Sequence, residues 1–208
     1  MATRASTSKA VMESRPSTSW VMTYHRRTVG TPDRVGGLPS HLPHAWPRCQ
    51  MCQARMGFAG QLYSSDRLPL GDHLSLQFYV CEDCRVEYEG ANDSIPIHME
   101  MLPPTAPENL RKRGVRARSQ PIRYISYSAV EDFMDQRTFN RRKLTEEDLP
   151  DGHLRADKVG GLFPYDGSDA PKITPRNWML AQFTWESVNG PIYLYHSASE
   201  GIYLFHYR

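Results

Sequence analysis

The sequence lacks the features that membrane spans, secretion signals and strongly basic proteins require. No apolar run among its 208 residues approaches the roughly 20 residues needed to cross a bilayer, and no apolar segment follows the first basic residues. Lys plus Arg number 25 against 23 Asp plus Glu, so the formal net charge is only +2. That balance is too small to argue for nucleic acid by itself. We therefore expect a soluble, unsecreted, cytoplasmic protein that has no membrane partner.

Long helical patterns are few, whereas turn-forming residues are common. The chain contains 14 Gly and 16 Pro, which favours many turns between short strands. Hydrophobic residues make up 39% of it, which is too many for a wholly disordered protein. The sequence predicts a strand-rich α+β fold of two tandem β-sheet half-repeats.

Composition divides the chain into a tail, two β-rich repeats and a linker. Residues 1–20 are rich in Ser, Thr and Ala without periodicity, and we interpret them as a disordered tail, with a transit peptide as the alternative. We expect a first β repeat over 21–104, a basic linker and strand over 105–128, and a helix with a second β repeat over 129–208. Residues 21–208 are expected to form one compact unit.

Alternating apolar residues predict several short strands. In the first clear strand, Leu74, Leu76, Phe78 and Val80 share one face. Ser128 is a plausible N-cap for the best helical pattern. The expected elements are strands over 74–80, 95–101 and 121–127, a helix over 129–139, and a terminal hairpin of 191–195 and 202–207.

A short motif occurs twice and predicts an internal duplication. Residues 34–39 read Arg-Val-Gly-Gly-Leu-Pro, and residues 158–164 read Lys-Val-Gly-Gly-Leu-Phe-Pro. Two Gly-Gly turns can arise by chance, but four features in the same order favour duplication. Paired glycines also have a backbone reason to recur, because a positive φ disfavours a Cβ. The later shared features are an aromatic strand, a tryptophan and a glutamine: Trp46 and Gln61 in one half, Trp178 and Gln182 in the other.

The four cysteines form two Cys-x-x-Cys pairs separated by 28 residues: Cys49 with Cys52, and Cys81 with Cys84. Two such knuckles brought together supply the four corners of a tetrahedral metal site. Soft sulfur ligands favour zinc or iron, and we predict a closed structural Zn²⁺. Disulfides are the first alternative, but they are rare in unsecreted proteins. A thioredoxin-like redox site is the second, but it needs one such pair at the start of a helix.

These residues resemble those of a known family. Gly36-Gly37-Leu38-Pro39, Trp46-Pro47, Cys49 to Cys52, Met56 and Gln61-Leu62, followed by Leu149-Pro150 and Lys158 to Gly161, resemble the YwqG-like bacterial family, a domain of unknown function. The first-half pattern is also distantly similar to the eukaryotic programmed cell death protein 2 group. The resemblance covers residues 30–208. It implies a duplicated β-rich fold and, from the eukaryotic relatives, the binding and escorting of a ribosomal protein, but it implies no catalytic residues.

A basic stretch is the main candidate for a second contact site. No acid lies between residues 111 and 123, and Arg141-Arg142-Lys143 follows. Such a run could contact phosphate or a partner protein. The alternative is a solvated linker that faces the acidic segment 144–169, whose net charge is −5 from seven acids and two bases. The candidate contact residues are Arg111, Lys112, Arg113, Arg116 and Arg118.

No catalytic motif is present, neither a Gly-x-Ser-x-Gly elbow, a P-loop nor a His-Glu-x-x-His helix. His98, His196 and His206 are interpreted as ordinary strand histidines, and the aromatic residues of the terminal hairpin as core with some capacity for an interface. The sequence therefore favours a non-catalytic, zinc-stabilised protein-binding module. A nucleic-acid-binding zinc protein that uses residues 111–143 is the alternative, and an unrecognised enzyme comes third.

Overall fold

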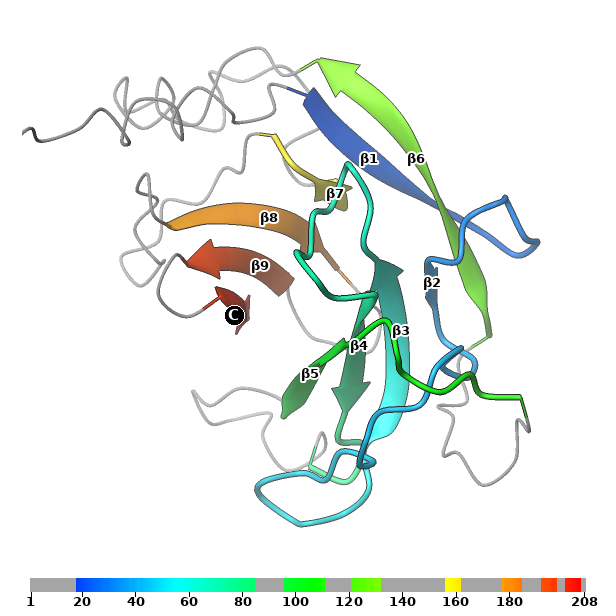
Figure 1. Ribbon diagram of the computed structural model, residues 1–208, viewed down its shortest axis with the longest axis vertical. Helices are drawn as coiled ribbons and strands as arrows, with labels where there is room; N and C mark the ends of the chain where they lie inside the picture. The colour runs from blue at the N-terminus through cyan, green and yellow to red at the C-terminus, as the bar shows by residue number, and fades with distance from the viewer. Residues whose placement is uncertain are drawn as a thin grey trace, which may run out of the picture. The chain divides into compact units, whose positions relative to one another are not determined.

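The computed structural model describes residues 18–84, 96–110, 121–131, 156–161, 177–184, 192–197 and 201–206. These ranges contain strands and no helix, so nothing there crosses a membrane as a long apolar helix (Figure 1). The strand-rich prediction is confirmed, whereas the helical part of the predicted α+β class has no counterpart in the described ranges. The strands are β1 (Thr18–His25), β2 (Arg34–Val35), β3 (Gly57–Tyr63), β4 (Ser75–Val80), β5 (Ile97–Leu102), β6 (Arg123–Glu131), β7 (Lys158–Val159), β8 (Asn177–Phe183), β9 (Ile192–Ser197) and β10 (Gly201–His206).

The chain forms two compact units, and each takes residues from distant parts of the sequence. The cysteine unit comprises Thr23–Ser126, Thr184–Ile192 and His206–Arg208, and its strands follow the order β6-β2-β3-β4-β5. The second unit comprises Met1–Met22, Tyr127–Phe183 and Tyr193–Phe205, with the order β10-β9-β8-β7-β1. Strands β1 and β6 each contribute residues to both units. Each unit is therefore completed by a strand that is remote in the sequence.

Strands β3, β4 and β5 form an antiparallel ladder that positions the cysteines (Figure 1). A bulge at Ala59 interrupts the β3–β4 pairing, since Phe58 pairs with Tyr79 whereas Gly60 pairs with Phe78. All six residues of β4 are buried. The predicted apolar face, which carries Phe78, is therefore covered, and so is the opposite face. A strand buried on both faces holds its two ends rigidly, and the second cysteine pair follows its C-terminal end.

The two Val-Gly-Gly segments have the same local backbone geometry. In the cysteine unit β2 pairs with β3 and β6, and in the second unit β7 pairs with β8 and β1, all antiparallel. The φ angles are 74° and 71° at Gly36 and Gly37, and 69° and 79° at Gly160 and Gly161. In both turns the first glycine donates its N–H to a carbonyl of the neighbouring strand, at 2.8 Å. Both pairs therefore occupy the left-handed region, where a Cβ costs energy.

The two glutamines that follow these motifs also have equivalent positions. Gln61 pairs in register with Arg34, and Gln182 pairs in register with Lys158. Each side-chain amide donates to the carbonyl of the residue two positions before that basic residue, over 3.0 Å from Gln61 and 3.2 Å from Gln182. Both glutamines are buried. A buried amide needs such partners, which explains a glutamine inside an apolar strand.

One sequence prediction at an element boundary is wrong. The helix predicted over 129–139 does not begin at Ser128, because β6 continues through Glu131; the rest of that segment lies outside the described residues. Pairing with a neighbouring strand outweighs the weak helical preference and the capping pattern there. β1 begins at Thr18, close to the expected end of the tail near residue 20, and residues 1–17 lie outside the described part.

The terminal hairpin is confirmed, with β9 and β10 adjacent in the second unit's strand order. Gly201 opens β10 with a φ of 77°, and residues 198–200 lie outside the described part. Tyr193 and Tyr195 are buried, so these two rings belong to the core as expected. Trp185 and Tyr207 lie outside the described residues.

Candidate metal centre

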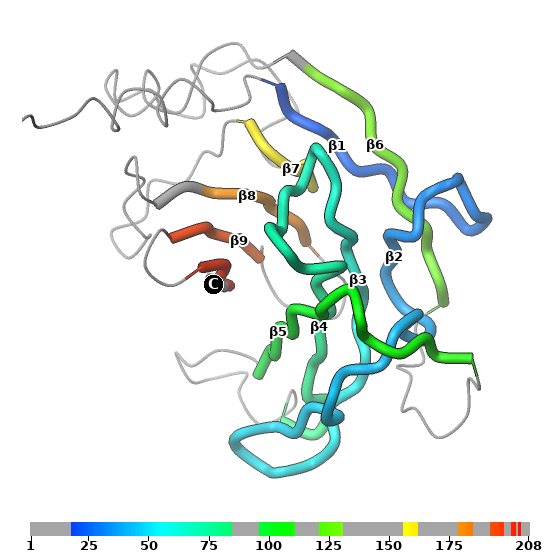
Figure 2. The backbone as a smooth tube through the Cα atoms, viewed as in Figure 1, coloured from blue at the N-terminus to red at the C-terminus, as the bar shows by residue number. Residues whose placement is uncertain are grey.

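The first cysteine pair lies in the long loop of residues 36–56 that joins β2 to β3 (Figure 2). A tight backbone turn holds the pair: the N–H of Gln53 donates to the carbonyl of Cys49, and the N–H of Cys49 donates to the carbonyl of Ala54, both over 2.9 Å. An isolated antiparallel bridge between Arg48 and Arg55 closes the turn. The N–H groups inside such a knuckle face the sulfur atoms, which favours thiolates there.

Gln53 adopts a left-handed conformation, with a φ of 60°. It directly follows the second cysteine of the knuckle, where the backbone must reverse. Its side chain donates to the carbonyl of Gln50 over 3.1 Å, and its own carbonyl accepts from the guanidinium of Arg48 over 2.9 Å. Local hydrogen bonds of this kind offset part of the cost of about 1–2 kcal/mol that a non-glycine residue incurs there.

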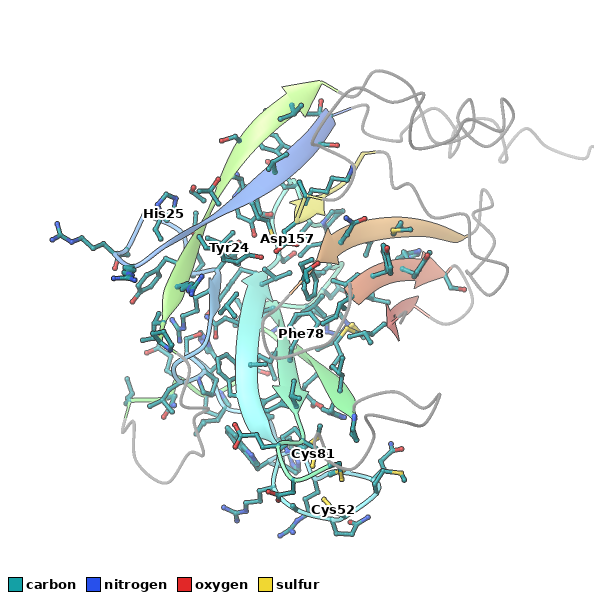
Figure 3. The ribbon with its side chains drawn as sticks, turned by 180° about the vertical axis from the view of Figure 1, so that it is seen from behind. Tyr24, His25, Cys52, Phe78, Cys81 and Asp157 are labelled. Atoms are coloured by element: carbon teal, nitrogen blue, oxygen red, sulfur yellow. The ribbon has the colours of Figure 1, made fainter. Side chains whose placement is uncertain are left out.

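The second cysteine pair follows β4 directly. Cys81 comes after Val80, and its N–H donates to the carbonyl of Pro96, just before β5, over 3.1 Å. Cys84 lies three residues further along, and the residues that follow it are outside the described part of the chain. The ladder of β3, β4 and β5 therefore delivers this knuckle to the same end of the sheet as the first (Figure 3).

The four sulfur atoms of Cys49, Cys52, Cys81 and Cys84 lie within 4.8 Å of one another. The Sγ atoms of Cys49 and Cys84 are 3.7 Å apart, and those of Cys52 and Cys81 are 3.5 Å apart. A tetrahedral centre with metal–sulfur bonds of about 2.3 Å has sulfur–sulfur edges of about 3.8 Å. All four cysteines are free thiols, since a disulfide bond is about 2.05 Å long. The predicted ligand set is thus brought together, and its geometry fits a metal ion.

Aromatic side chains cover the buried side of this cluster. Tyr79 makes edge-to-face contacts with Trp46 at 5.2 Å and with Phe58 at 5.8 Å between ring centroids. The indole N–H of Trp46 donates to the carbonyl of Met56 over 2.8 Å. Three of the cysteines belong to the same core cluster, whereas Cys52 is exposed.

The pKa values of the thiols differ within the cluster. Burial alone would raise the pKa of Cys49, but hydrogen bonds from the backbone N–H groups of Cys52 and Met51, and from neighbouring thiols, bring it down to about 7. The hydrogen bond with Cys52, together with burial, raises the pKa of Cys84, and burial raises the pKa of Cys81. A metal ion that takes all four as thiolates must therefore displace protons from Cys81 and Cys84.

The other candidate residues are not part of this cluster. Arg111, Lys112, Arg113, Arg116 and Arg118 lie outside the described residues. Nε2 of His98 on β5 forms a hydrogen bond of 2.9 Å with a carboxylate oxygen of Glu100, which is an ordinary contact between neighbours on one strand face. Burial lowers the pKa of His196 on β9, and the side chain of His206 is not described.

Sequence reasoning missed a polar cluster around the loop before the first knuckle. The hydroxyls of Ser40 and Tyr63 bond each other, and His41 Nδ1 lies 2.9 Å from the Tyr63 hydroxyl. Gln61 accepts from both the N–H and the hydroxyl of Ser40 over 3.0 Å. The signal in the sequence is Gln61, a glutamine within an apolar strand.

Comparisons with known proteins find no counterpart: no family model, no curated protein and no solved structure matches the chain.

Proposed function

We propose that this chain is a zinc-stabilised protein-binding module without catalytic activity, which escorts a client protein or neutralises a partner. The observation that carries the proposal is the closed set of four cysteine sulfurs. A metal with four protein ligands has no open position for a substrate or an activated water, so it acts on structure. Four soft sulfur ligands in tetrahedral positions favour zinc among the common metals, and zinc undergoes no redox change.

The proposed metal would hold together two segments that no disulfide joins. The loop of residues 36–56 and the end of β4 meet at the sulfur atoms, beneath the ring of Tyr79. Structural zinc contributes about 10–16 kcal/mol of apparent binding free energy, which is comparable with the whole stability of a domain. The metal would therefore fix the shape of this loop and of the surface it presents.

The tip of the first knuckle is the proposed contact surface for the partner. Met51, between the two cysteines, is 63% exposed, and Gln50, Cys52 and Gln53 beside it are exposed as well. Methionine side chains adapt to differently shaped apolar surfaces, which makes them common at binding sites for several partners. Partner binding would then depend on the metal, because the metal determines where Met51 lies.

The test is a pull-down with the full-length, zinc-loaded chain, with and without nuclease treatment. We expect protein partners that survive nuclease and are lost with Met51→Glu. The matched control is Leu110→Glu, because Leu110 is 81% exposed and lies outside the knuckle. Recovery that is abolished by nuclease would instead favour nucleic acid and the basic stretch within 111–143. Equal loss of the protein partners in both variants would show that the knuckle tip is not the contact surface.

Three further proposals concern origin and location. We propose that the chain is a YwqG-like protein and that its halves arose by duplication; the equivalent geometry of the two Val-Gly-Gly turns and of Gln61 and Gln182 supports this. We also propose a soluble protein in the cytoplasm. The four free thiols support a reducing compartment.

A further inference from the structure

The guanidinium of Arg34 lies on the sheet face of the cysteine unit without a carboxylate partner. Arg34 on β2 pairs in register with Gln61 on one side and Tyr124 on the other, so the three side chains share one face. One of its terminal nitrogens, Nη2, donates to the carbonyl of Leu38 over 2.5 Å. In the part of the chain that the structure describes, no Asp or Glu forms an ion pair with it.

The hydrogen-bonding capacity of this guanidinium is only partly used. Its Nε is buried and has no hydrogen-bond partner among the described residues. An arginine has five N–H donors and stays charged at any ordinary pH. Burial lowers the pKa of Arg34, and the neighbouring phenols of Tyr124 and Tyr63 partly oppose that shift. A partly desolvated cation without a carboxylate partner gains when an anion contacts its terminal nitrogens.

Hydroxyl and imidazole groups lie next to this cation. Tyr63 follows Gln61 by two residues and so lies on the same face of β3 as the glutamine beside Arg34. Its hydroxyl is held by Ser40 and by His41 Nδ1. The side-chain amide of Gln77 on β4 donates to the carbonyl of His41 over 2.8 Å, and this hydrogen bond fixes the backbone of the cluster. Arg34, Tyr63 and Tyr124 are each half-buried.

We propose that Arg34, together with the hydroxyl of Tyr124, forms a binding site for a carboxylate or phosphate group. A planar guanidinium matches the oxygen pairs of either anion, and the phenol hydroxyl of Tyr124 can donate to a remaining oxygen. The site lies on the face that carries Gln61, and its residues are separate from the four cysteines. It does not depend on the proposed protein-binding function, since a free metabolite and an acidic side chain present the same group.

The test uses the full-length, zinc-loaded protein and follows the Arg34 Nε–H signal by NMR during titration with inorganic phosphate and, separately, with acetate. We expect saturable shifts of this signal and of the Tyr124 signals with at least one anion. The anion that binds more tightly identifies the ligand as a phosphate or a carboxylate compound. Arg34→Gln should weaken that binding at least about tenfold.

The control is Arg123→Gln, which removes the same charge one residue from Tyr124. Arg123 pairs with Val35, so it lies on the opposite face of the sheet. The Arg123→Gln variant should bind the anion with the same dissociation constant as the unmodified protein. Absence of any saturable shift at Arg34 in the unmodified protein would overturn the proposal and leave Arg34 as a brace for the turn at Leu38. Equal weakening in both variants would also overturn it, because a general charge effect would then explain the binding.

Discussion

Removal of one buried sulfur tests the role of the proposed metal most directly. Cys84 is 5% exposed, and its Sγ is 3.7 Å from that of Cys49. In Cys84→Ser a hydroxyl replaces the thiol. A serine hydroxyl does not ionise near neutral pH and is a poor ligand for a soft site, so three sulfurs remain. We expect the variant to bind no zinc at stoichiometric concentration and the cysteine unit to lose its anchor.

The size of the effect follows from the place of the centre in the core. A structural zinc supplies roughly 10–16 kcal/mol of binding free energy. If only about a third of it contributes to the stability of the folded chain, loss of the zinc costs about 3–5 kcal/mol. A chain of this length loses about 2–4 °C of Tm per kcal/mol. The expected fall in Tm is therefore about 6–20 °C. Loss of the cover over the centre would also change the fluorescence of Trp46, which contacts Tyr79.

The assay combines elemental analysis with thermal melting, with and without a chelator. The chelator should lower the Tm of the unmodified protein to that of Cys84→Ser, and it should leave the Tm of the variant unchanged. Met51→Ser is the matched control, because Met51 lies within the same knuckle but is exposed and supplies no sulfur ligand to the cluster. A Cys84→Ser protein that retains one zinc per chain and melts within about 2 °C of the parent would refute the reasoning.

Four further predictions follow from the described contacts. Zinc affinity should fall at least about 100-fold per pH unit on acidification, because the raised pKa values of Cys81 and Cys84 mean that binding releases at least two protons; a dye-competition assay at pH 6.5 and 7.5 showing a flat dependence would contradict this. Gly37→Ala and Gly161→Ala should each cost about 1–2 kcal/mol through their positive φ, and Gly37→Ala somewhat more, since a Cβ there would lie 2.4 Å from the Ile122 side chain; denaturant unfolding checks both, and a neutral Gly161→Ala would count against the matched geometry. Replacement of Arg111, Lys112, Arg113 and Arg116 by Gln should leave protein binding nearly intact, since exposed ion pairs contribute about 0–1 kcal/mol; a steep salt dependence that disappears in the variant would indicate phosphate contacts instead. Tyr79→Phe should cost about 1–3 kcal/mol without loss of zinc, because it leaves the buried Oε1 of Gln77 without the phenol donor; loss of the metal in this variant would show that the ring cover needs its hydroxyl.

The cysteine site was predictable because its information is local. Two thiols at positions i and i+3 define a knuckle without reference to the rest of the chain, and only two knuckles exist to be joined. The φ of Gln53 was not predictable from residue type, since left-handed backbone usually carries Gly or Asn. The knuckle imposes that conformation, and hydrogen bonds from Gln53 and Arg48 stabilise it.

Strand pairing between distant segments was the part that local patterns could not supply. The sequence predicts two consecutive repeats, and its local patterns do not show that β6 pairs with β2 or that β1 pairs with β7. Periodicity identifies a strand and its faces, but not which strand lies beside it. The same limitation explains the wrong helix start, because a sheet neighbour decides the conformation of residues 129–131. The polar cluster at Tyr63 was hidden for the same reason, since Ser40 and Gln61 meet only after β2 pairs with β3.

Tyr79 connects the metal centre with the polar cluster of the same unit. Its ring packs against Trp46 and Phe58 over the sulfur atoms, while its hydroxyl donates to Gln77 over 2.6 Å. Gln77 in turn donates to the carbonyl of His41, whose ring bonds Tyr63. A buried tyrosine and glutamine cannot move independently without leaving polar atoms unpaired, at a cost of about 1–3 kcal/mol each. A change in the position of the first knuckle is therefore opposed by the same hydrogen bonds that fix the groups around Arg34, so a metal at the cysteines would also stabilise the hydrogen bonds of Gln77.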